Sequence, residues 1–390
     1  MASLSHHSLL TSIAFALLGS TALAQGVEGE AFAERLRTVA EEQGTPLVYE
    51  SVATEGETVI LSGVSVGEAD AKLDLGTVRF ETVSGSNADG WQVERVPFAD
   101  VDTTDEETRT LVRGMVIEGL SIAPDGGEDA AVTELEFERM GLANMSIERN
   151  GKEAFRLAGF DVTNQPGEAG GFSAEFGVEE FFVYASVNAE SNGAAVMTEI
   201  GYPQLQGDMS GSATWDTASG ELSLAPLLLR VEDAGELSLA YTITGYTPAF
   251  VQSLAQLQQQ MAADPESQAG GMAMIGLISQ LYVNSAEIVF EDGSLTGRLL
   301  DYYAGQNSQS RDELVNSLVG MLPLALSYLN NPEFQTQVSE AVEAFLRDPQ
   351  SLKIAVSPPE PVPATQIVGA AMGAPQTLPA VLDLTITSNE

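Results

Sequence analysis

The stretch Ile147-Glu148-Arg149-Asn150-Gly151-Lys152-Glu153-Ala154-Phe155 decides the fold class of this chain. Its Asn-Gly pair stands between two runs in which apolar and polar residues alternate. A type I′ turn needs positive φ at both central residues, and Asn-Gly adopts that conformation more readily than most pairs. The stretch therefore predicts a β-hairpin.

The same pattern repeats from about residue 46 to residue 245. Alternating runs lie at 59–66, 72–75, 78–81, 135–138 and 222–224, and turn pairs such as Asp89-Gly90 and Asn192-Gly193 separate them. A chain of such hairpins implies a large antiparallel sheet. We expect an α+β fold, in which a large curved antiparallel β-sheet, built as a hairpin meander, is packed by amphipathic helices from the C-terminal half.

Helical patterns lie on both sides of this region. Residues 28–43 predict an amphipathic helix with Phe32, Leu36 and Val39 on one face. After residue 246, helix starts are marked by Thr247-Pro248, by the capping box Ser310-x-x-Glu313 and by Asn331-Pro332. The chain thus divides into an N-terminal helix plus β-rich region (25–245), a mainly helical region that packs on the sheet (246–350), and a Pro-rich connector, short helix and closing strand (351–390). The alternative is that residues 25–390 form one continuous domain.

The first 24 residues have the pattern of a signal peptide. An apolar run interrupted by small polar residues ends in Ala22-Leu23-Ala24, which predicts cleavage before Gln25. We therefore expect a periplasmic protein, or a secreted one, with no membrane span after the leader is cleaved. The chain has no cysteine, so its fold must hold without disulfides.

Composition excludes several classes of function. The chain has 56 Asp and Glu against 16 Lys and Arg, which gives a net charge of −40. Such a charge repels phosphate backbones, so we expect no nucleic-acid partner, and it disfavours electrostatic docking on anionic lipid headgroups. The two histidines, His6 and His7, both lie in the leader.

Without histidine or cysteine, few catalytic mechanisms remain. The segment Gly63-Val64-Ser65-Val66-Gly67 matches the nucleophile-elbow pattern, but it lies in an alternating run and Ser65 has no histidine base. Zinc and copper sites lose their usual ligands as well. We expect no catalytic residues and no cofactor. A carboxylate-based, glycosidase-like hydrolase is the alternative, because it needs no histidine.

Asp100, Asp102 and Asp105 superficially resemble a calcium-binding loop, which would suit an acidic calcium-dependent surface or adhesion module. The pattern lacks the oxygen ligand and the glycine at loop positions five and six. Thr103-x-x-Glu106 serves equally well as a capping box for a short helix through Val112.

The apolar stripes of the predicted helices suggest a different kind of site. They could simply cover the sheet, or they could line an apolar groove between sheet and helices. The groove would be formed by Phe250, Leu254, Met272, Met274, Leu318 and Phe345. Methionine side chains suit an adaptable apolar wall of this kind.

The second half of the chain, roughly 205–390, resembles a group of uncharacterised exported proteins of Gram-negative bacteria. The resemblance rests on Trp215–Leu227, Asp233–Leu239, Phe290–Leu295, Phe345–Leu352 and Pro361-Val362-Pro363. These proteins are loosely AsmA-like or YdgA-like. The resemblance implies a periplasmic envelope protein concerned with lipid or outer-membrane homeostasis. It supplies no functional residues. We therefore expect a non-enzymatic protein that binds lipid, another apolar ligand or envelope proteins.

Overall fold

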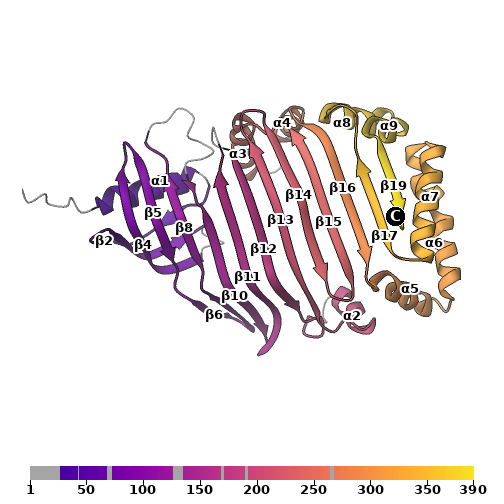
Figure 1. The fold of residues 1–390 in the computed structure, drawn as a ribbon, viewed down its shortest axis with the longest axis horizontal. Helices are drawn as coiled ribbons and strands as arrows, with labels where there is room; N and C mark the ends of the chain where they lie inside the picture. The colour runs from indigo at the N-terminus through magenta and orange to yellow at the C-terminus, as the bar shows by residue number, and fades with distance from the viewer. Residues whose placement is uncertain are drawn as a thin grey trace, which may run out of the picture.

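A computed structural model describes residues 27–42, 44–67, 73–125, 135–167, 171–188, 192–263 and 268–390. The predicted leader over 1–24 lies outside these residues. Within them, the chain forms a 19-stranded antiparallel sheet and nine α-helices, most of the helices in the C-terminal half (Figure 1). The predicted α+β meander is therefore confirmed. The sheet is open, since the outermost strands β2 and β19 each pair with a single neighbour in the described residues.

The strands in the first half of the sheet are short and uneven, whereas those in the second half are long and regular. Their bounds are β1 Leu47–Val48, β2 Ser51–Glu55, β3 Thr58–Val66, β4 Leu73–Ser86, β5 Gly90–Pro97, β6 Val101–Asp105, β7 Thr108–Arg113, β8 Val116–Ile122, β9 Leu135–Glu136, β10 Arg139–Arg149, β11 Lys152–Pro166, β12 Phe172–Val183, β13 Leu205–Asp216, β14 Glu221–Val231, β15 Gly235–Thr244, β16 Tyr282–Asp292, β17 Ser351–Val356, β18 Val362–Pro363 and β19 Leu384–Ser388.

The helices are α1 Gly29–Glu42, α2 Asn192–Glu199, α3 Pro248–Ala263, α4 Gln268–Ile278, α5 Leu295–Gln306, α6 Arg311–Ala325, α7 Pro332–Arg347, α8 Ala364–Gly373 and α9 Leu378–Leu382, with 3-10 turns η3 Leu326–Leu329 and η4 Pro375–Thr377. The predicted starts of α3, α6 and α7 are confirmed, and Ser310 and Glu313 form the expected reciprocal capping box.

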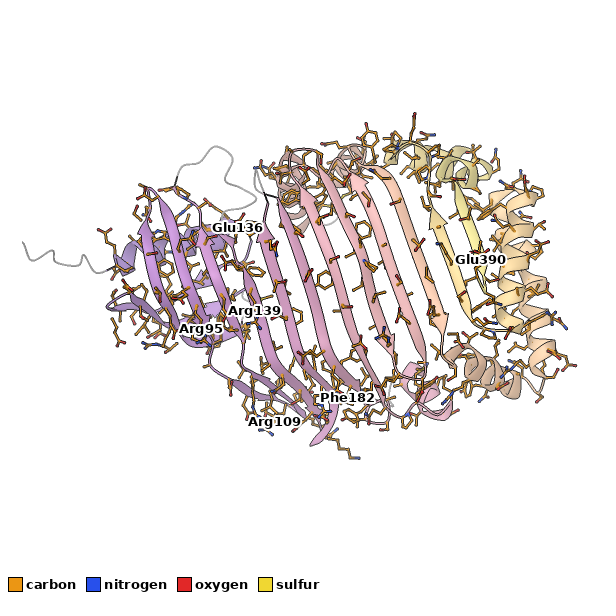
Figure 2. All side chains as sticks on the ribbon, in the orientation of Figure 1. Arg95, Arg109, Glu136, Arg139, Phe182 and Glu390 are labelled. Carbon is orange, nitrogen blue, oxygen red and sulfur yellow. The ribbon has the colours of Figure 1, made fainter. Side chains whose placement is uncertain are left out.

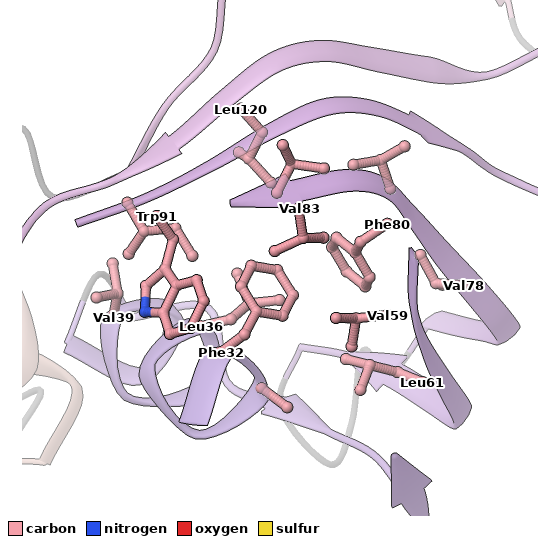
Figure 3. Packing of buried hydrophobic residues seen from close by; sticks show 14 of the residues in the cluster. Phe32, Leu36, Val39, Val59, Leu61, Val78, Phe80, Val83, Trp91 and Leu120 are labelled. Atoms are coloured by element: carbon pink, nitrogen blue, oxygen red, sulfur yellow. The ribbon is translucent and has the colours of Figure 1, made fainter. Parts of the chain in front are cut away.

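The first strands curl around α1 and enclose the main hydrophobic core. β4 pairs with β3 through its first half and with β5 through its second half, and the strand changes direction at Thr82, which has a φ of 55°. Phe32 of α1 is fully buried, with its ring 5.1 Å from Phe80 and 5.6 Å from Trp91 (Figure 3). This is a closed core of the ordinary kind, with sheet on one side and an amphipathic helix on the other.

From β10 onward the sheet is a regular meander. The order β10–β11–β12–β13–β14–β15–β16–β17–β19 follows the chain, except that the short β18 pairs with the start of β16. Asn150 and Gly151 connect β10 to β11 with φ of 52° and 70°, which confirms the predicted turn. Short turns join β10 to β11, β13 to β14 and β14 to β15, whereas α2, the pair α3–α4 and the group α5–α7 stand between β12 and β13, β15 and β16, and β16 and β17. The strands still pair in chain order.

Two local predictions were wrong. Residues 103–112 do not form a helix but the hairpin β6–β7, in which Thr103 pairs with Thr110 and Glu106 has a φ of 51°. Asn192-Gly193 is not a hairpin turn but the start of α2. In both places a four-residue signal fits two structures equally well, and the pairing of neighbouring strands decides between them.

No helix in the described part of the chain has both the length and the apolar character needed to cross a membrane. The helices of the C-terminal half lie at the borders of the sheet. In Figure 1, α3, α4, α8 and α9 lie at one end of the long strands, α2 and α5 at the other end, and α6 and α7 beside the last strand β19.

Candidate functional site: an uncovered apolar face

The long strands present an almost purely apolar face. Residues paired directly across antiparallel strands point to the same side of the sheet, so the register assigns each row to a face. One row from β14 to β19 consists of Leu227, Leu239, Ile288, Ile354 and Ile386.

The flanking rows on the same side continue this pattern, because side chains two positions apart along a strand share a face. One row contains Leu229, Leu237, Phe290 and Leu352, and the other contains Leu224, Tyr241, Ala286, Val356 and Leu384. These two rows, together with the first row of Leu227, Leu239, Ile288, Ile354 and Ile386, are called the apolar face below.

The opposite side of the sheet carries charged ladders. Arg230 reaches Glu236 at 2.8 Å and Asp208 at 3.5 Å, and Lys353 reaches Glu287 at 2.6 Å. Further along the sheet, Arg139 lies 3.0 Å from Glu118 and 2.6 Å from Asp161, while Arg95 reaches Glu118 at 3.8 Å. Figure 2 labels Arg95 of β5 and Arg139 of β10, the two strands that flank β8 and its Glu118. These pairs are partly exposed and contribute little stability each, but they identify this side as the one that faces water.

The apolar face is exposed in its middle. Ile288 and Ile354, which pair directly, are 43% and 37% exposed, and Leu237 is 40% exposed. A single exposed leucine is unremarkable, whereas adjacent large apolar residues on several strands mark an interaction surface. Strands about 4.8 Å apart with a rise of about 3.3 Å per residue make this face, over five strands and about five residues of each, roughly 24 Å wide and roughly 17 Å long.

Helices border this face on three sides. At the end where β13 finishes, Trp215 donates a 2.7 Å hydrogen bond to the Tyr246 carbonyl, and the Tyr246 ring packs 5.2 Å from Phe250 of α3. Beside the last strands, Phe345 of α7 lies edge-on to Phe290, with ring centroids 6.2 Å apart. At the other strand end, α2 and α5 pack around a small cluster of Ile200, Tyr202, Ala234, Leu205, Val231, Leu295 and Leu299.

On the fourth side, the apolar face continues into the closed core. Val96, Ile117, Met140, Val162 and Phe176 form one row across β5, β8, β10, β11 and β12. Val96 is buried in the core under α1, and Ile117 packs against that core. The side of the sheet that α1 covers is therefore the same side that is uncovered farther along.

The residues predicted to line a groove are not gathered in one place. Phe250, Leu254 and Met274 come together in a small cluster between α3 and α4. Met272 is 76% exposed on α4. Leu318 is exposed on α6, and Phe345 is buried against the edge of the apolar face. Sequence reasoning missed the strand rows themselves, although their alternation is visible in residues 237–239 and 352–354.

The three aspartates predicted as calcium ligands each have a different structural role. Asp102 on β6 accepts two hydrogen bonds from Arg109, at 2.8 and 2.7 Å, and this pairing lowers the pKa of its carboxyl. Asp100 accepts a hydrogen bond from the Gly114 amide, and Asp105 ends β6. Within the described residues, no group of three or more His, Cys, Asp or Glu side chains is placed to hold a metal ion.

Ser65 is a buried residue of β3, paired with Asp74 of β4. It does not occupy the strand-to-helix turn that a nucleophile elbow requires.

Glu136 lies on β9 (Figure 2), and its partial burial raises the pKa of its carboxyl group. The folded state therefore holds this proton more tightly than the unfolded chain, in which a glutamate titrates near pH ~4.3. As the pH rises above that value, the charged form is penalised in the fold and its contribution to stability is lost.

We expect Glu136→Gln to change stability in a pH-dependent way. The variant should match the wild type at pH ~3, where the carboxyl is protonated in both states, and become the more stable of the two by pH ~7. Urea unfolding at both pH values measures this difference. Glu138→Gln, at an exposed side chain two residues further along the chain, is the matched control. A stability difference that is the same at both pH values would show that burial does not perturb Glu136.

Fold and face together define an open antiparallel α+β sheet protein with one apolar face framed by helices. A family model described as an uncharacterized protein matches residues 228–389, from β14 to the last strand. That segment contains most of the apolar face and all of α3 to α9. No curated protein matches the chain.

Proposed function

We propose that this chain is a non-enzymatic protein of the bacterial envelope that binds the acyl chains of lipid along its apolar face. The observation that carries the proposal is the exposure of Leu237, Ile288 and Ile354 in the middle of a face otherwise made of aliphatic and aromatic side chains. Leaving such a surface in water costs about 25 cal/mol for each Å² that a ligand could cover.

The extent of the face favours a long flexible ligand. Small metabolites bind in concave sites with a few convergent polar groups. The rows from β14 to β19 instead offer parallel apolar ridges with hardly any hydrogen-bonding side chain, which suits hydrocarbon chains. The polar side of the sheet keeps the complex in solution through its charged ladders.

The envelope setting rests on the predicted leader at 1–24 and on the resemblance to AsmA-like and YdgA-like exported proteins. The matching family carries no functional description that would test this resemblance. Periplasmic localisation is therefore part of the proposal.

The test is to purify the full-length protein from the periplasm of an expressing Gram-negative cell, extract it with organic solvent, and analyse the extract by mass spectrometry. We expect phospholipid or fatty acid to copurify, and native mass spectrometry to show a mass increase when phospholipid is added to stripped protein. An extract without lipid, together with no mass shift on addition, would remove the proposal. A stable dimer free of lipid would show that a second copy covers the face instead.

A further inference from the structure

A second surface stands out because the helices that form it carry no charge. The elements α3, α4, η3, α8, η4 and α9 contain no Asp, Glu, Lys or Arg, and α6 has none after Glu313. In a chain of net charge −40, with 18% charged residues, such long uncharged segments are unexpected.

These segments come from distant parts of the chain but meet at one border of the sheet, at the end of the long strands where α3, α4, α8 and α9 lie (Figure 1). The Ala364 amide, at the start of α8, donates a 2.9 Å hydrogen bond to the Leu281 carbonyl that follows α4. The Tyr328 hydroxyl of η3 donates to the Ala371 carbonyl of α8, and the Asn331 side chain donates to the Gln376 carbonyl at 3.0 Å. We call this border the uncharged rim.

The uncharged rim exposes large apolar side chains to an unusual degree. Met372, Leu324, Met272 and Tyr328 are 84%, 77%, 76% and 64% exposed. Further exposed members are Met321, Ile275, Val368, Ile278 and Met261. None of these residues is a member of the small cluster of apolar side chains that packs α3 against α4.

The opposite border of the sheet has the reverse character. It carries Asp233, Asp292, Asp301, Arg311 and Asp348, among other charged residues, around α2, α5 and the hairpin ends. The described loops that adjoin the rim carry the carboxylates Asp216, Glu221, Glu360 and Asp383 but no Lys or Arg. The molecule is therefore polarised along its strands, with uncharged apolar helices at one end and a border that carries charges of both signs at the other.

We propose that the uncharged rim docks on the surface of a zwitterionic lipid bilayer. The helices of the rim present methionine, leucine, isoleucine and tyrosine side chains with no charge among them, which match the interfacial region of a membrane, and the carboxylates of the adjoining loops favour zwitterionic over anionic headgroups. The rim offers no basic residue to anionic headgroups, and the acidic remainder of the chain is repelled by them. Docking by this end keeps the charged border farthest from the membrane.

The rim also adjoins the site already described. Tyr246 and Phe250 connect α3 to Trp215 at the border of the apolar face. Docking would therefore bring the apolar face to the membrane edge-on, with its strands pointing toward the bilayer. An acyl chain could then move between bilayer and sheet without crossing the charged side. This inference rests on the proposed function only for the identity of the passenger, and the docking itself can be measured alone.

The test uses the absence of cysteine in the chain. Met372→Cys, labelled with an environment-sensitive fluorophore, should show a blue shift when phosphatidylcholine vesicles are added. Val48→Cys, on an apolar residue 54% exposed at the N-terminal end, is the matched control and should show none. Vesicles that contain phosphatidylglycerol should bind more weakly at low salt.

A charge-insertion pair gives a second readout that needs no label. Leu324→Glu with Met372→Glu should lower vesicle flotation about tenfold, because both glutamates must be desolvated at the interface. Val48→Glu with Leu73→Glu adds the same charge at exposed apolar sites far from the rim and should leave flotation unchanged.

The outcomes separate the two proposals. Flotation without any lipid in the solvent extract would support docking and remove lipid carriage, whereas bound lipid without flotation would do the opposite. No blue shift and no flotation at any phosphatidylcholine concentration would overturn docking. A blue shift that appears on concentrating the protein without vesicles would identify a second copy as the occupant, and would overturn it as well.

Discussion

Replacing Phe32 by alanine is expected to lower the free energy of unfolding by about 3–5 kcal/mol. Phe32 is fully buried between α1 and the curled strands, and its ring contacts both Phe80 and Trp91. Truncation removes transfer free energy and leaves a cavity that a helix pinned between two sheet segments cannot close.

Urea unfolding followed by tryptophan fluorescence measures this effect well. Trp91 lies in the affected core and Trp215 lies in the long-stranded region, so a Trp215→Phe background reports on the core alone. Leu324→Ala, at a side chain 77% exposed, is the control and should change stability by no more than about 0.5 kcal/mol. A loss below about 1 kcal/mol for Phe32→Ala would show that α1 is not packed as described.

Placing a carboxylate on the apolar face is expected to weaken lipid binding tenfold or more, by roughly 1.4 kcal/mol or greater. Ile288→Glu, alone and with Ile354→Glu, puts an unpaired charge where the acyl chain would lie, and burying such a charge is costly. Since both side chains are partly exposed, the fold should tolerate the change.

Val289→Glu is the matched control for this experiment. It is the next residue on the same strand, adds the same charge, and pairs with Ser238 and Lys353 on the polar side of the sheet. Displacement of a fluorescent fatty acid measures binding for all variants. Equal affinity of Ile288→Glu and Val289→Glu would contradict a ligand on the apolar face, whatever their absolute affinities.

Features set by neighbours in sequence were predictable. The Asn150-Gly151 turn, the helix with Phe32, Leu36 and Val39, and the capping box at Ser310 each depend on a few adjacent residues. The hairpin β6–β7 could not be predicted, because Thr103 and Glu106 are as common at the start of a helix as in a strand and its turn. There the pairing with β10 decides, and that partner lies about 40 residues away in sequence.

The candidate site could be predicted only in part. The apolar stripes of the helices predicted a groove lined by Phe250, Leu254, Met272, Met274, Leu318 and Phe345, whereas these residues lie in separate places and Met272 is exposed. The sequence contains no signal that places helices at the borders of a sheet rather than over it. An amphipathic helix is stabilised by packing its apolar side against any apolar neighbour. Phe345 of α7 packs against Phe290 at the edge of the apolar face, and a position over the middle of that face would bury it equally well.

By itself, the sequence determined the class of the fold, the antiparallel meander, the acidic character, and the lack of histidine after His7 and of cysteine throughout. Alternation specifies that each strand has an apolar side, since side chains point up and down in turn. Only the tertiary structure decided what that side meets. Under α1 it became a closed core, and from β10 onward it stayed open, because whether a face is covered depends on where distant helices come to lie and not on the strand's own residues.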